Sequence, residues 1–258
     1  MAGKIIGEPA HDGQVLRITL NAPKGNILDG EMMAGLQTEL DGLKGRPEVK
    51  LLLITGAGDH FSFGASVEEH TKERAPEMLR QFHGLFRSLV RSSVPAAAVV
   101  SGQCLGGGFE LALACHFLFV DETARLGCPE IQLGVFAPPA SLILPMKIGQ
   151  ARADDLLLTG RSIKGADAAA IGLATTAYGD RESMEAGVDE WIGKHILPRS
   201  ASSLRFAVRA AQWRFHESLL DGLERLEGLY TGGLMETEDG NEGILSFLER
   251  RKPEWKDR

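Results

Sequence analysis

Two short runs of this chain are apolar at every position. Leu51–Ile54 ends at Thr55 and Gly56, and Ala96–Val100 follows Pro95. A strand with one face in water alternates apolar and polar residues, so uninterrupted apolar runs predict strands that are covered on both faces. The chain therefore needs helices on two sides of a sheet, which indicates an α/β fold.

Amphipathic helices are predicted between these strands. Asp29 can cap a helix whose apolar residues recur on one face, and a second amphipathic helix is predicted from about residue 76 to residue 90. Further strands are predicted at 15–20, 117–120 and 124–126, and further helices at 109–115 and 151–158. Strand and helix alternate, as expected for an α/β body.

The pattern changes near Pro198, beyond which no strand is predicted. From residue 200 to residue 251 the apolar positions recur at helical spacing. We therefore expect two parts: an α/β core over residues 1–199 that contains the active site, and a helical region over residues 200–258. The helical part has more apolar positions than a few isolated helices can bury, which predicts packing between subunits.

Composition excludes several classes of protein. The net charge of −7 gives no basic face for nucleic acid, and no apolar run approaches the ~20 residues that span a bilayer. The first residues lack the apolar stretch of a signal peptide, so we expect a soluble, cytoplasmic protein. The three cysteines are too far apart for a C-x-x-C pair, and we predict neither a disulfide scaffold nor a metal site.

A glycine run lies between the strand 96–100 and the helix 109–115. Gly106, Gly107 and Gly108 have no side chains, so a ligand can approach the backbone, and the free amides of a helix start favour negative charge. The run lacks the lysine and hydroxyl of a P-loop and the spacing of a dinucleotide-binding loop. The alternative is a tight turn where a helix packs closely on a strand.

Two glutamates accompany this run. Glu110 lies in an otherwise apolar first helical turn, and Glu130 follows twenty positions later. Burial raises the pKa of a carboxyl toward neutrality, where it can exchange protons with a substrate or with water. Each glutamate alone is more often a solvated residue or a carboxylate favoured by a helix start. Sequence spacing cannot bring the two together.

Four stretches of the chain resemble one known family. The stretch 102–134, GQCLGGGFELALACHFLFVDETARLGCPEIQLG, resembles the active-site segment of the enoyl-CoA hydratase (crotonase) family. HFSFGASV at 60–67, LLLTGRSIKGADAAAIGL at 156–173 and TEDGNEGILSFLERRKPEW at 237–255 resemble other segments of that family. The resemblance covers nearly the whole chain.

The resemblance implies a fold and a set of roles. The fold is a spiral of ββα units followed by a helical trimerisation region, assembled as a homotrimer or a dimer of trimers. Ala65 and Gly107 fall on the two oxyanion-hole positions, whose amides bind the thioester oxygen. Glu110 would deprotonate the attacking water, and Glu130 would exchange a proton with the carbon that becomes saturated.

The resemblance also implies the ligand. An acyl-CoA thioester is the expected substrate, with no cofactor beyond the CoA that it carries, and neither nucleic acid nor a membrane is an expected partner. Lys24, Ser62, Phe63 and Ser66 lie where the family holds the CoA adenine and pantetheine.

Two segments depart from the common family pattern. Ser66 replaces an aspartate, which changes the polarity of the pocket, and VFAPPAS at 135–141 replaces a glycine-rich loop. Phe136, Pro138 and Pro139 are therefore expected to make a stiff, apolar wall for the acyl group. The alternative is drift in a loop that still starts a helix.

The substrate is inferred from three segments. GNILDGEMM, FSFGASVEEH and GVFAPPAS resemble those of family members that hydrate cyclohexa-1,5-diene-1-carbonyl-CoA to 6-hydroxycyclohex-1-ene-1-carbonyl-CoA in anaerobic degradation of benzoate. The alternatives are a generic short-chain enoyl-CoA hydratase and a non-catalytic member of the fold that binds acyl-CoA or RNA. Acidic composition disfavours RNA, and the presence of both glutamates favours hydration over isomerisation and over an inactive site.

Overall fold

The computed structural model describes residues 3–22 and 24–258, and its core is a six-stranded sheet. The strands follow the order β1-β2-β3-β4-β6-β9, with β1 antiparallel to β2 and every other neighbouring pair parallel. Their bounds are β1 Ile5–Ala10, β2 Val15–Leu20, β3 Leu51–Gly56, β4 Ala96–Val100, β6 Phe117–Asp121 and β9 Thr176–Tyr178.

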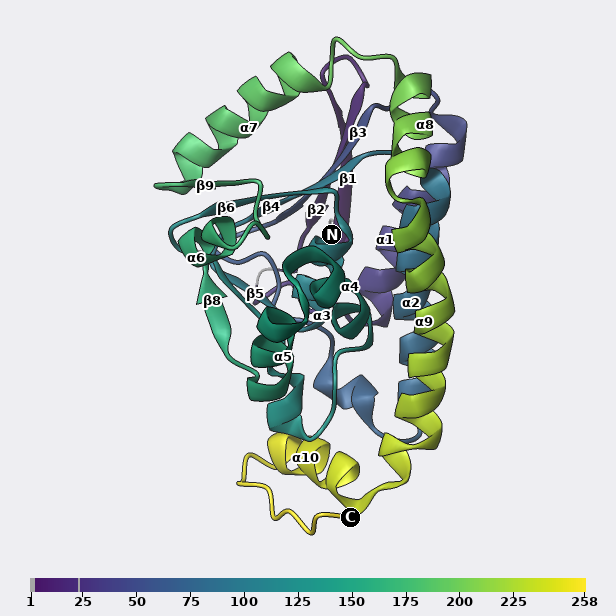
Figure 1. The fold of residues 1–258 in the computed structure, drawn as a ribbon, viewed down its shortest axis with the longest axis vertical. Coiled ribbons are helices and arrows are strands. Elements are labelled where there is room, and N and C mark those ends of the chain that lie inside the picture. The colour runs from purple at the N-terminus through teal and green to yellow at the C-terminus, as the bar shows by residue number, and fades with distance from the viewer. Residues whose placement is uncertain (1–2, 23) are drawn as a thin grey trace.

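Helices cover both faces of this sheet, as the apolar runs predicted (Figure 1). On one face, Leu51 and Leu53 of β3 pack with residues of α7 (Arg181–His195). On the other face, Leu52 and Ile54 join the main core with α1 (Gly30–Gly42) and α2 (Ala75–Ser92). Successive residues of a strand point to opposite faces, so a strand that is buried twice must be apolar throughout.

A second, smaller sheet completes the spiral. Its order is β5-β7-β8, with bounds β5 Gln103–Leu105, β7 Arg125–Gly127 and β8 Ser162–Lys164. The chain runs from β4 through β5 into α3 (Gly107–Ala114), then through β6 and β7 into η3 (Pro129–Leu133). Each turn of the spiral therefore delivers a helix start from the small sheet, and this repeated ββα arrangement is the fold that the resemblance implied.

The sequence pattern missed four strands. β1, β5, β8 and β9 are short or lie at a sheet edge, and β1 contains a glycine and a proline that weaken its strand pattern. The strand predicted at 124–126 is β7, one residue later, and the helix predicted at 109–115 begins two residues earlier in the glycine run. The remaining elements are η1 Leu43–Gly45, η2 Val67–His70, α4 Pro138–Ile148, α5 Gln150–Thr159 and α6 Gly165–Ala170.

The chain is mainly helical from residue 201 to residue 248, as predicted, whereas residues 249–258 are not helical. The helices are α8 (Ala201–Ala211), α9 (Trp213–Gly232), η4 (Leu234–Glu236) and α10 (Glu238–Leu248). In Figure 1, α8 and α9 run along one side of the molecule, where α9 contacts α2 and α4, and α10 lies at its end. Within residues 3–22 and 24–258, no helix has the length and apolar character needed to cross a membrane.

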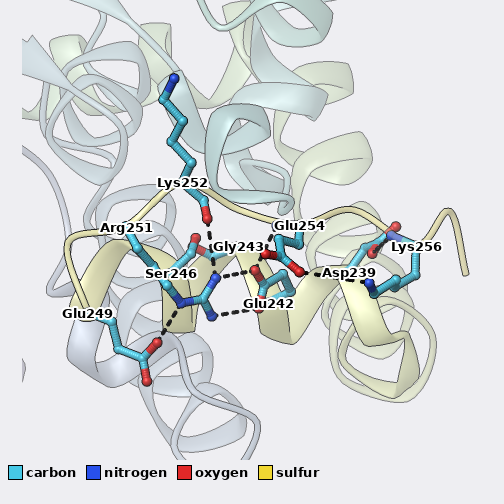
Figure 2. Close-up of polar contacts among 9 residues, drawn as sticks. All are labelled: Asp239, Glu242, Gly243, Ser246, Glu249, Arg251, Lys252, Glu254 and Lys256. Atoms are coloured by element: carbon cyan, nitrogen blue, oxygen red, sulfur yellow. Dashed lines mark hydrogen bonds and ion pairs between the residues drawn. The ribbon is translucent and has the colours of Figure 1, made fainter.

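The last residues fold back on α10 (Figure 2). The Arg251 guanidinium pairs with the carboxylates of Glu242 and Glu249. The amide of Glu254 donates to Glu242 Oε1 at 2.8 Å, and the amide of Lys256 donates to Asp239 Oδ1 at 2.7 Å. The carboxylates of α10 thus hold the tail by accepting hydrogen bonds from its main-chain amides.

Candidate active site

A pocket lies between the spiral core and the helical C-terminal region. Five parts of the chain contribute to it: the segment from the loop after β3 through η2, the helix α2, the start of α3, the segment 129–138 and the helices α9 and α10. Its lining includes Ala65, Gly107, Glu110, Glu130, Phe136 and Tyr230. The structure therefore brings together both glutamates and both amide positions that the sequence singled out.

Each glycine of the run 106–108 lies against a different neighbour. A Cβ atom on Gly106, whose φ is +49°, would lie 2.7 Å from Glu130 Oε1, and one on Gly108 would lie 2.5 Å from the Ser62 Cβ. A Cβ on Gly107 would lie 3.2 Å from the Ala65 amide nitrogen. Both readings of the run are therefore present: it is a tightly packed turn, and it brings backbone close to the pocket.

Ala65 and Gly107 lie close together and both line the pocket. Gly64, at φ +104°, approaches the run so closely that its Cβ would lie 3.4 Å from the Gly107 nitrogen. Neither the Ala65 amide nor the Gly107 amide donates a hydrogen bond to the described part of the chain. Gly107 is the first residue of α3, so the partial positive charge of the helix start adds to its N–H.

Glu110 is held inside the core by α3. Its side chain is 3% exposed, and Oε1 accepts a hydrogen bond of 2.9 Å from the Ala140 amide. Burial raises the pKa of this carboxyl well above 4.5, and the nearby charge of Glu130 raises it further. Glu110 therefore keeps its proton more readily than an ordinary glutamate.

Glu130 lies on η3, across the pocket from α3. Burial raises the pKa of its carboxyl to about 7. The residue as a whole is partly exposed, but Oε2 is buried and has no hydrogen-bond partner among the described residues. A carboxyl with this pKa can both give and take a proton near neutral pH.

The C-terminal region supports the turn that carries Glu130. A Cβ on Gly243 of α10 would lie 2.0 Å from the Leu133 carbonyl oxygen, and one on Gly134 would lie 3.1 Å from the Trp255 ring. Backbone of α10 and the ring of Trp255 thus pack directly on η3 and on the residue that follows it. The tail contacts of Figure 2 keep Trp255 close to this position.

The four residues predicted to bind CoA have different environments. Phe63 is 43% exposed and lines the pocket, and Lys24 is exposed. Ser66 is partly buried, and its carbonyl oxygen lies 2.7 Å from His70 Nδ1. Ser62 is fully buried, and its hydroxyl donates to the Asn26 carbonyl and accepts from the Gly64 amide. The side chain of Ser62 therefore orders the loop and is not presented to a ligand.

The segment 135–141 forms one wall of the pocket and then starts α4. Phe136 and Pro138 line the pocket, whereas Pro139 is buried behind it and is not part of the lining. Pro138 and Pro139 are the first two residues of α4, where the missing N–H of proline costs nothing. The segment still starts a helix, as both interpretations of it require.

Two pocket residues escaped the sequence analysis. Tyr230 belongs to α9, and its spacing among apolar residues is that of an ordinary core position. His70 lies in η2 and lines the pocket, and burial lowers the pKa of its imidazole. Tyr230 lies in none of the family-like segments, and His70 is the last residue of FSFGASVEEH, where no chemical pattern marks it, so only the tertiary structure places both at the pocket. Among the residues described, no group of three or more metal-ligating side chains is arranged around one point.

Comparison with known proteins agrees with this fold. The model of the enoyl-CoA hydratase/isomerase family matches residues 10–258, and the chain belongs to that family. The chain is 45% identical to the cyclohexa-1,5-dienecarbonyl-CoA hydratase of Thauera aromatica, over 96% of this chain and 95% of that protein. It is 34% identical to a "probable enoyl-CoA hydratase" of Mycobacterium bovis, over 95% of each chain. A crystal structure of an enoyl-CoA hydratase from Mycobacterium avium superposes with a TM-score of 0.86 at 26% identity, over 100% of both chains.

Proposed function

We propose that this chain hydrates a cyclic dienoyl-CoA, converting cyclohexa-1,5-diene-1-carbonyl-CoA to 6-hydroxycyclohex-1-ene-1-carbonyl-CoA. The observation that carries the proposal is one pocket that holds two buried carboxyls beside two adjacent free amides. Family membership makes the chain an acyl-CoA enzyme of the hydro-lyase type. The identity with the Thauera aromatica hydratase supports the cyclic substrate.

The proposed mechanism assigns one task to each group. The Ala65 and Gly107 amides hold the thioester oxygen and stabilise negative charge that develops on it. Glu110 takes a proton from the attacking water, whose oxygen bonds to C2, the carbon β to the thioester, so that negative charge spreads onto the thioester oxygen and C5. Glu130 gives its proton to C5, which leaves the double bond between C1 and C6 and, after renumbering of the ring, gives the 6-hydroxycyclohex-1-ene product. Its pKa of about 7 supports this role, because a sizeable fraction of the enzyme then carries the proton at neutral pH.

The wall formed by Phe136 and Pro138 supports a flat substrate. A phenylalanine ring and a proline at a helix start have few conformations, so this side of the pocket is stiff and apolar. A six-membered ring matches such a surface better than a short flexible chain does. The CoA part of the thioester would pass the exposed Phe63 and Lys24.

The test compares two substrates on one enzyme. We expect kcat/KM for the cyclic dienoyl-CoA to exceed that for crotonyl-CoA by at least ~10²-fold, which corresponds to about 3 kcal/mol of transition-state binding. Replacing residues 135–141 by a glycine-rich loop should shrink the ratio mainly through loss of the cyclic substrate. An unmodified protein that prefers crotonyl-CoA would instead be a generic short-chain enoyl-CoA hydratase.

The same assay distinguishes a hydratase from a protein that only binds acyl-CoA. Tight binding of CoA thioesters without turnover of either substrate would indicate a non-catalytic acyl-CoA-binding protein. The net charge of −7 disfavours a role in RNA binding.

We also propose that the chain assembles through its helical C-terminal region, as a trimer or a dimer of trimers. Residues 200–258 carry large apolar side chains that one subunit leaves exposed: Phe206, Trp213, Leu229, Leu245, Phe247 and Trp255. Burial of such side chains between subunits would remove them from water. Sedimentation should show an assembly at micromolar concentration, and a stable monomer would refute the proposal.

A further inference from the structure

Tyr230 presents a buried phenol to the pocket that holds the two carboxyls. The residue is 1% exposed and belongs to α9, whereas Glu110 and Glu130 come from the spiral core. Its ring packs edge to face on Phe136, with centroids 5.3 Å apart. The ring is therefore fixed by packing, and the position of its oxygen is fixed with it.

The Tyr230 hydroxyl has no hydrogen-bond partner within the described residues. Four buried side-chain atoms share this property, on Glu69, His83, Glu130 and Tyr230. Of these residues, Glu130 and Tyr230 line the pocket, and the other two do not. Buried polar atoms are rarely left without a hydrogen-bond partner. Two such atoms in one pocket therefore point to a ligand that makes a hydrogen bond with each of them.

The two atoms are chemically complementary. Burial raises the pKa of the Tyr230 phenol, and the carboxylates of Glu130 and Glu110 raise it further, so the phenol remains a donor at neutral pH. The Glu130 Oε2 atom has no donor directed at it and can accept. An oxygen that both accepts and donates would serve the two at once. Water has this property, and so does an alcohol.

We propose that Tyr230 is a catalytic residue whose phenol donates a hydrogen bond to the oxygen that the enzyme adds to its substrate. The bond is made to the water before addition and to the new hydroxyl group afterwards. The phenol keeps its own proton throughout, because the proton of the water goes to Glu110. This inference rests on the proposed hydratase function.

The test uses the two tyrosines of the chain as a matched pair. Tyr230→Phe removes the hydroxyl and keeps the ring, and Tyr178→Phe does the same on β9, on the opposite face of the sheet. We expect Tyr230→Phe to lower kcat by about 10–100-fold, the cost of one hydrogen bond to a reacting group. Its Tm should stay equal or rise, because the free enzyme loses no hydrogen bond. Tyr178→Phe should retain turnover.

A binding measurement separates a hydrogen bond from a change of shape. We would measure Kd for 3-hydroxybutyryl-CoA and butyryl-CoA, and for the cyclic pair with and without its 6-hydroxyl group. The pair to compare is the one that matches the substrate that the enzyme turns over. In that pair, the ratio of the two Kd values that favours the hydroxylated member should be about tenfold smaller in Tyr230→Phe than in the wild type. Equal weakening of both members would overturn the proposal, as would unchanged turnover or a Tm that falls with kcat.

The two proposals fail in different ways. A wild-type enzyme that hydrates neither substrate would refute the hydratase function. An active wild type whose Tyr230→Phe variant matches it in turnover and in preference for the hydroxyl group would refute the role of Tyr230 alone.

Discussion

The two carboxyls of the pocket are held by parts of the chain that are built differently. Glu110 lies on α3, inside the core, with one hydrogen bond from the Ala140 amide. Glu130 lies on the short η3, against which α10 and Trp255 pack from the far end of the sequence. Glu110 therefore depends on local packing within the spiral, whereas Glu130 depends on contacts with the C-terminal region. The helical region is thus part of the site.

The largest effects should come from the carboxyls themselves. Glu110→Gln and Glu130→Gln keep the shape of each side chain and remove its proton exchange, so each should lower turnover by roughly 10²–10⁴-fold. Binding of a CoA thioester, measured by calorimetry, should survive. If either variant kept near-wild-type turnover, the proposed role of that residue would be wrong.

The pH dependence of hydration should report Glu130. Hydration needs Glu130 protonated and Glu110 ionised, so kcat/KM should fall about tenfold per pH unit above an apparent pKa near 7, and it should also fall toward low pH as Glu110, whose pKa is raised as well, takes up a proton. A flat profile between pH 6 and pH 9 would contradict this role. The reverse reaction, in which Glu130 takes a proton, should show the opposite dependence on this group.

The same pKa has a consequence for stability. A carboxyl whose pKa rises from 4.5 to about 7 on folding binds its proton more tightly in the folded state. The stability that comes from this tighter proton binding is therefore fully present below pH 4.5. It is lost as the pH rises from 4.5 through 7, and the loss in the free energy of unfolding is about 3 kcal/mol. Denaturant unfolding at pH 5 and pH 8 should show this loss in the wild type, and Glu130→Gln should remove the share that belongs to Glu130.

A glycine pair tests the support of η3 directly. Gly243→Ala places a methyl group on the Leu133 carbonyl, so it should cost about 1–3 kcal/mol of stability and lower turnover about tenfold. Gly228→Ala, on exposed helix with open space around it, should gain up to about 1 kcal/mol and leave turnover unchanged. In a Glu130→Gln background, Gly243→Ala should cost little further turnover. Full activity of Gly243→Ala would show that Glu130 does not depend on the contact between η3 and α10.

The smallest effect should come from the tail. Arg251→Gln removes exposed ion pairs with Glu242 and Glu249, which contribute little to stability in water. Turnover should stay within about twofold, but carboxypeptidase should release the last residues faster, because the tail has then lost the Arg251 ion pairs that help to hold it on α10. A loss of turnover as large as that of Gly243→Ala would show that the tail, more than α10, supports η3.

The sequence predicted what depends on local pattern. The buried strands β3 and β4 and the Asp29 helix cap follow from apolar runs and from side-chain chemistry, and all were found. The short strands β5 and β8 have three residues each, too few to show a period. They form because the spiral brings them beside β7.

The site was predictable in its residue types and not in its geometry. Glu110 and Glu130 were identified through a resemblance, because no spacing rule shows that α3 and η3 share a pocket. Tyr230 lies 100 residues beyond Glu130, and the sequence pattern did not single it out. The contact of Gly243 with Leu133 joins residues 110 apart, and only the folded chain shows it.

The two prolines that begin α4 make one main-chain proton unusually informative. Because Pro138 and Pro139 carry no N–H, the Ala140 amide is the first donor of that helix, and it is bonded to Glu110. Its NMR chemical shift should follow the ionisation of that carboxyl, and its exchange with solvent deuterium should be slower than is usual for the first turn of a helix. A single ¹⁵N-labelled alanine would then report the protonation state of a buried group, in the resting enzyme and with a CoA thioester bound.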